Sequence, residues 1–167
     1  MFNLQTYTIV HVLISLIGIA TGVIVALGLL DSNRLTRPTR VFLASTALTS
    51  LTGFGFPFGR ILPSHIVGLL SLGMLIVAVF ARYGRGLAGA WRWIYVVTAM
   101  IALYFNVFVL VAQLFQKVPM LKSVAPTQSE PPFAVTQLAV LAIFFVFTIV
   151  AAMKFHPERK RSTTAAI

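Results

Sequence analysis

The sequence predicts an all-α integral membrane protein, a bundle of five transmembrane helices with a periplasmic N-terminus and a cytoplasmic C-terminus. Hydrophobic residues make up 59% of the 167 residues and charged residues only 10%, whereas a soluble domain carries about 25% charge. The apolar residues come in long blocks, which is typical of membrane-crossing helices. The basic residues gather at alternate ends of these blocks, which indicates an oriented bundle.

Five apolar blocks carry the fold prediction. The longest, residues 91–115, corresponds to roughly 35 Å of helix, enough to cross a bilayer. The other predicted spans are residues 8–30, 41–58, 65–83 and 133–154. Residues 1–7 contain no Lys or Arg, so we expect the first block to be a retained span and not a secretory signal. Residues 1–155 are assigned to one transmembrane domain and residues 156–167 to a basic cytoplasmic tail.

The net charge of +10 has two interpretations. It is typical either of a protein that binds nucleic acid or of membrane loops that follow the positive-inside rule. The predicted spans place three basic residues on one side, Arg60, Lys117 and Lys122. The other ten lie opposite: Arg34, Arg37, Arg40, Arg82, Arg85, Arg92, Lys154, Arg159, Lys160 and Arg161. This asymmetry favours membrane loops over nucleic-acid binding and predicts that the ten residues lie in the cytoplasm.

A stripe of small residues follows one face of the first predicted span. Ser15, Gly18, Gly22 and Ala26 recur at steps of three and four, and Gly18 with Gly22 forms a GxxxG pattern. Such a stripe allows two membrane helices to pack closely, either within one chain or between two copies. We expect packing within this chain, and His11 on the same stripe is then expected to point into the bundle.

Five polar residues are predicted to share one layer of the membrane, near the outer leaflet. Measured along each helix from the arginine-rich end, His11 lies roughly 28 Å deep, and His65 and Gln137 roughly 25 Å. Asn106 and Gln113, on one face of the fourth span, lie at roughly 21 and 32 Å. Polar side chains at membrane depth normally face other helices or a wet cavity.

Two of these residues are candidate ligands. Imidazoles on facing helices suit haem b, or a metal ion with a further ligand, and Gln137, Asn106 or Ser15 would orient their rings. The alternative is that His11 and His65 hydrogen-bond lipid head groups, water or a backbone carbonyl. The chain has no cysteine, which excludes thiolate ligands and nucleophiles. Its only carboxylates, Asp31, Glu130 and Glu158, lie in predicted loops, so paired-carboxylate chemistry is excluded and no enzyme class is assigned.

The predicted loop at residues 116–132 contains four prolines, which exclude one continuous helix through it. It is either a lid over the polar layer or a rigid turn that starts the fifth span. Glu130 is expected to pair with Arg60 or Lys122 across this outer surface.

Three stretches carry a resemblance to other proteins: AGAWRWIYVV, FNVFVLVAQLFQKVP and APTQSEPPF. Over residues 91–133 the chain resembles a group of small bacterial inner-membrane proteins, and this resemblance implies location but no activity. It is also loosely similar to small membrane b-type cytochromes, in having two histidines in a helical bundle.

Three functions are therefore open. The first is a haem- or metal-binding protein that uses His11 and His65. The second is an accessory or assembly subunit that docks on a membrane-protein partner or on another copy of itself. The third is a lipid- or quinone-binding protein with a cavity lined by Asn106, Gln113 and Gln137. In all three the lipid bilayer surrounds the bundle.

Overall fold

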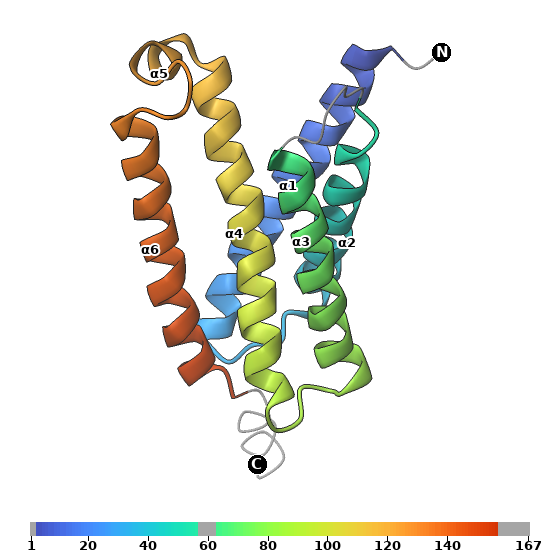
Figure 1. Ribbon diagram of the computed structural model, residues 1–167. Helices are drawn as coiled ribbons and strands as arrows, with labels where there is room; N and C mark the ends of the chain where they lie inside the picture. Colours follow the sequence, from blue (N-terminus) through green and yellow to red (C-terminus); the bar gives the residue numbers. More distant parts are fainter. Residues whose placement is uncertain (1–2, 57–62, 157–167) are drawn as a thin grey trace.

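The computed structural model describes residues 3–56 and 63–156, and within these ranges it contains helices and loops but no strand (Figure 1). Five long helices make up the bundle: α1 (Leu4–Leu30), α2 (Thr36–Gly53), α3 (Pro63–Val79), α4 (Trp91–Lys117) and α6 (Pro131–Lys154). A π-helical segment, η1 (Phe80–Gly84), continues α3, and the short helix α5 (Pro119–Val124) precedes α6. The all-helical prediction is confirmed for this part of the chain.

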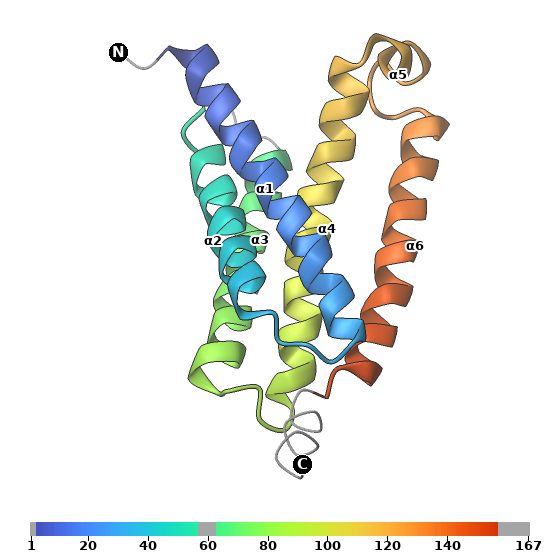
Figure 2. The same ribbon diagram turned by 180° about the vertical axis from the view of Figure 1, so that it is seen from behind.

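Helix α4 is the central helix of the bundle. It packs against α3 on one side and α6 on the other, and it also contacts α1, while α2 packs between α1 and α3. Successive long helices run in alternate directions, so α1 begins at the end that carries α5 and α6 ends at the opposite end (Figures 1 and 2).

In the described part of the chain, four helical stretches are long and apolar enough to cross a membrane: Leu4–Leu30, Ser64–Gly84, Trp91–Lys117 and Pro131–Lys154. The last is the most exposed, because only 6% of its apolar window is buried inside the protein, as expected for a helix that faces lipid. The fifth predicted span, α2, is not among the four. It carries Arg37 and Arg40 in its first two turns and many hydroxyl side chains, so its crossing of the membrane stays a prediction.

Helix α2 also begins earlier than the sequence predicts, at Thr36 and not at residue 41. Pro38 is the third residue of the helix, where the backbone N–H has no partner within the helix, so the missing donor costs nothing. The two predicted loop residues Arg37 and Arg40 therefore project from a helix. Helix α2 ends at Gly53, before residue 58, where the predicted span ends.

The segment between α4 and α6 is a structured turn. Pro119 and Pro131 are the first residues of α5 and α6, positions that suit proline because their N–H groups are not needed. The side chain of Gln128 donates a hydrogen bond of 2.6 Å to the carbonyl of Ala112 in α4. This anchoring favours the interpretation as a rigid turn that starts α6.

Glu130 stabilises the same turn through hydrogen bonds within the turn, in place of the predicted ion pair with Arg60 or Lys122. Its carboxylate accepts hydrogen bonds from the Thr127 hydroxyl at 2.8 Å and from the backbone N–H groups of Thr127 at 3.1 Å and Ser129 at 3.0 Å. Desolvation acts to raise the pKa of the Glu130 carboxyl, but these hydrogen bonds together hold it below its ordinary value. The predicted pairing with Lys122 is not among these contacts, and Arg60 lies outside the described residues.

The GxxxG pattern packs within the chain, as predicted. A Cβ atom added at Gly22 would lie 2.5 Å from Cδ1 of Leu103 in α4 and 2.9 Å from the ring of Phe42 in α2. Helix α1 therefore approaches two helices at once at a point where it has no side chain. The close approach gives van der Waals contact, which drives helix association in membranes.

This contact predicts a difference between two glycines. Gly22→Ala should lower the free energy of unfolding by about 1–3 kcal/mol, because the added methyl group overpacks the contact with Leu103 and Phe42. Gly73→Ala, on α3, is the matched control: a Cβ there meets nothing within 4 Å, and alanine is the better helix former by about 0.5–1 kcal/mol. Thermal unfolding in detergent measures both. A Gly22→Ala variant as stable as Gly73→Ala would contradict the packing of α1.

Candidate functional site

His11 belongs to α1, and its side chain lies against the end of α2. Its Nδ1 is 2.8 Å from the hydroxyl of Thr52, and the Thr52 hydroxyl in turn donates to the carbonyl of Leu48 at 2.6 Å. A hydroxyl has one proton to donate. With that proton donated to the carbonyl of Leu48, Nδ1 of a neutral His11 ring is the donor to Thr52 and Nε2 carries the lone pair.

An aromatic ring packs against each of the two predicted ligands. Phe56 meets His11 edge to face, with ring centroids 5.1 Å apart, and Phe54 stacks on His65 with centroids 5.6 Å apart. Thr52 and Phe54 are two residues apart, so they point to nearly opposite faces of α2. The structure thus brings both histidines to one end of α2, on different sides of it.

A metal site built from protein ligands alone is not found in residues 3–56 and 63–156. Within them, no group of three or more His, Asp or Glu side chains is arranged to hold a metal ion. The third histidine, His156, follows α6 at the opposite end of the bundle. Haem or metal binding through His11 and His65 therefore stays a prediction.

Asn106 joins three helices at the centre of the bundle. Its side-chain amide donates a hydrogen bond of 3.1 Å to the hydroxyl of Thr46 in α2, and the residue is only 9% exposed. Gly18 of α1 lies directly beside this pair: a Cβ there would be 3.1 Å from Ser45 Oγ and 3.3 Å from Thr46 Oγ1. The prediction that Asn106 faces protein is confirmed.

The other two amides of the predicted layer lie elsewhere. Gln137 of α6 is buried and donates a hydrogen bond of 3.1 Å to the carbonyl of Phe108 in α4. Gln113 is exposed. Asn106 therefore serves the junction of α4 with α1 and α2, whereas Gln137 serves the junction of α4 with α6. The polar residues that were predicted to form one layer therefore lie at separate helix junctions.

Sequence reasoning missed the burial of Arg82, which it counts among the basic residues on the cytoplasmic side. In the structure Arg82 belongs to η1 and is only 8% exposed. Its Nη2 donates a hydrogen bond of 2.6 Å to the carbonyl of Arg34, and its Cζ lies 5.3 Å from the centre of the Tyr95 ring. The guanidinium thus ties the connection between α1 and α2 to η1 and α4.

The sequence does contain a signal for this burial. Ser71, Leu75, Ala78 and Arg82 follow one another at steps of four, three and four, and all four are buried. That spacing places them on one face of a helix. Arg82 continues the inward face of α3, although its charge indicates a loop when the residue is considered by itself.

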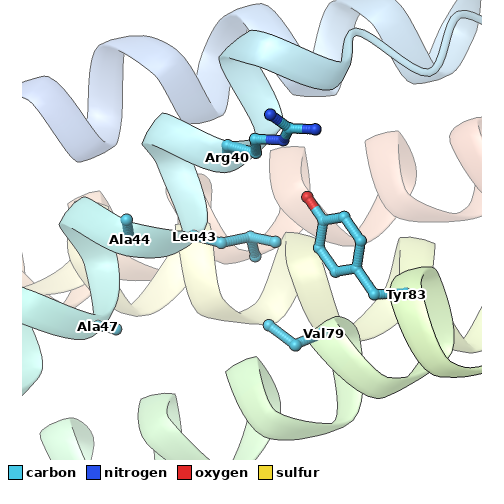
Figure 3. A pocket seen from close by; sticks show the side chains of 6 residues that line it. All are labelled: Arg40, Leu43, Ala44, Ala47, Val79 and Tyr83. Atoms are coloured by element: carbon cyan, nitrogen blue, oxygen red, sulfur yellow. The ribbon is translucent and has the colours of Figure 1, made fainter.

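A groove lies between α2 and the end of α3, at the arginine-rich end of the bundle. Its volume is about 430 Å³. Leu43, Ala44 and Ala47 of α2 and Val79 of α3 form apolar walls, while Arg40 and Tyr83 stand at one end (Figure 3). None of these residues belongs to the predicted polar layer, so the groove is a second candidate site.

No protein-family model, curated protein or solved structure matches this chain. Function must therefore be argued from the geometry of the bundle.

The central hydrogen bond generates a prediction. Asn106→Leu and Thr46→Val should each destabilise the bundle, and a double-mutant cycle should give a coupling of about 1 kcal/mol, the size of a hydrogen bond between membrane helices. Gln113→Leu, at an exposed position of the same helix, is the control and should change stability by less than about 0.5 kcal/mol. Reversible unfolding in mixed detergent micelles measures each variant. Zero coupling would show that the two side chains do not interact.

Proposed function

We propose that this chain is an integral membrane protein that holds an amphiphilic lipid in the groove between α2 and η1. The shape and chemistry of the groove carry the proposal. The open groove has hydrocarbon side chains along its length and a cation with a phenol at one end (Figure 3). A molecule with an apolar chain and a polar head has the same two parts in the same order.

The position of the groove supports this occupant. Arg40 and Ala47 are seven residues apart, so the groove runs along roughly 10 Å of α2, inward from the basic end. Its volume of about 430 Å³ falls in the range of ligand sites, about 300–1,000 Å³. If α2 crosses the membrane as the fifth span in the predicted orientation, the groove opens to the cytoplasmic leaflet.

The groove is a better lipid site than the cavity that the sequence predicts. That cavity requires Asn106, Gln113 and Gln137 to line one space, but Asn106 bonds to Thr46 of α2 and Gln137 to the backbone of α4. Ala44 and Ala47 create room in the groove because their side chains end at Cβ. The small residues of α2 thus open a space on this side of the helix.

Filling the groove tests the proposal. Ala44→Phe should abolish retention of a lipid through purification, because the ring occupies the apolar channel; Ala44 is exposed, so the fold should tolerate it. Ala142→Phe, at an exposed position of α6, is the matched control and should retain the lipid. Native mass spectrometry of the purified full chain counts bound lipids. Equal lipid retention by Ala44→Phe and Ala142→Phe would rule out the groove as the site.

A ligand on His11 is the second candidate, and one observation favours it. The hydrogen bond to Thr52 fixes the ring and leaves Nε2 with its lone pair, the arrangement that metal-binding histidines share. His65 stacks on a different side of α2. The structure therefore supports His11 as a ligand more directly than a pair of histidines.

Absorption spectra and metal analysis of the purified protein test this candidate. It requires a Soret band or a stoichiometric metal ion that His11→Ala removes and His156→Ala, at the other end of the bundle, retains. Thr52→Val should weaken binding by about 10- to 100-fold, since it removes the group that orients the ring. A colourless, metal-free protein would exclude the candidate.

A further inference from the structure

The polar end of the groove has a composition that restricts its ligand. Figure 3 shows the hydroxyl of Tyr83 pointing toward the guanidinium of Arg40. In the described part of the chain, neither the Arg40 guanidinium nor the Tyr83 hydroxyl makes a hydrogen bond. Two donor groups therefore face the same space, and both are open to a ligand.

These groups determine what kind of head group fits. A guanidinium has five N–H donors and no acceptor, and a phenol supplies one further O–H donor. The partner must therefore offer several acceptor oxygens, and a negative charge is favoured. A phosphate meets both conditions, because its oxygens accept the paired N–H bonds of an arginine.

The charges around the groove discriminate between phospholipids. Arg82 is buried and donates to the carbonyl of Arg34, and the guanidinium of Arg85 lies over the Trp91 ring at 5.3 Å. Arg40 is thus the cation that lines the groove. Among the described residues, no carboxylate lines the groove to bind the ammonium group of a zwitterionic head. Other arginines at this end, such as Arg37, repel such an ammonium.

We propose that the groove selects an anionic phospholipid, with the phosphate held by Arg40 and Tyr83 and one acyl chain lying along the apolar walls. This assignment rests on the proposed lipid-binding function and specifies its ligand. Arg40 is the residue that determines head-group selectivity. The acyl chain, which contacts Ala44, Ala47 and Val79, supplies binding that does not depend on charge.

Native mass spectrometry of the full chain in a non-ionic detergent tests the selectivity. The probes are phosphatidylglycerol and phosphatidylcholine with identical acyl chains. The wild type should bind one phosphatidylglycerol with a lower Kd than phosphatidylcholine. Arg40→Gln should reduce this preference about fivefold, the effect of one basic residue at an anionic lipid surface. Arg37→Gln, on the same helix but outside the groove, should reduce it by less than twofold.

Two further measurements separate the components of the site. Tyr83→Phe, which removes only the hydroxyl, should weaken phosphatidylglycerol binding by about two- to tenfold. Glycerol phosphate, which has the head group without acyl chains, should not displace the lipid at equal concentration. Displacement by glycerol phosphate would show an anion site in place of a lipid site and overturn the proposal.

The outcomes distinguish this proposal from the proposed function. If Ala44→Phe expels both lipids while Arg40→Gln leaves their ratio unchanged, the groove binds lipid but the head-group assignment is wrong. If Ala44→Phe expels neither lipid, both proposals fail. Both proposals are supported if Arg40→Gln loses the preference for phosphatidylglycerol, Arg37→Gln keeps it, and Ala44→Phe binds neither lipid.

Discussion

The bundle depends on the close approach of α1 to α2 and α4 at Gly18 and Gly22. Lipid tails are as apolar as leucine, so the hydrophobic effect does not press helices together inside a bilayer, and contact between their surfaces must do so. Where α1 has no Cβ, Ser45, Thr46, Phe42 and Leu103 of its neighbours occupy the space. The hydrogen bond from Asn106 to Thr46 lies at this contact and joins α4 to α2. Helices α3 and α6 then pack on the outer sides of α4.

Two polar side chains of helix α2, those of Ser45 and Thr52, bond to the backbone of the helix itself. The hydroxyls of Ser45 and Thr52 donate to the carbonyls of Val41 and Leu48, four residues earlier, each at 2.6 Å. This type of hydrogen bond satisfies a hydroxyl within one helix. It leaves the hydroxyl oxygen free to accept a second bond from another helix, as Thr52 does from His11. The least apolar of the long helices therefore contacts both α1 and α4 through polar side chains.

Arg82 is a buried residue that links the two elements on either side of the groove. Its hydrogen bond to the carbonyl of Arg34 holds the start of α2 against η1, and these two elements supply the polar end of the groove. The next residue, Tyr83, turns outward and lines that groove. Consecutive residues of one π-helical segment thus serve the interior and the surface, which agrees with the frequent occurrence of such segments at functional sites. A lipid bound by Arg40 and Tyr83 would bridge the same two elements that Arg82 joins from inside.

The sequence by itself determined the class of the protein and the position of its main helix. Long apolar blocks cannot leave backbone groups unpaired in hydrocarbon, so they must be helical, and the predicted span at 91–115 differs from α4 only at its end. Periodicity also predicted the inward face of Asn106, but it placed Gln113 on that same face, and Gln113 is exposed. Only the tertiary structure decided which helix lies opposite each face. Counting residues along each helix gave His11 and His65 similar depths. Depth along a helix axis does not show what lies beside a residue, and in the structure α2 separates the two rings. The burial of Arg82 and the groove beside Arg40 depend on how far apart neighbouring helices lie. The sequence pattern of one helix does not give that distance.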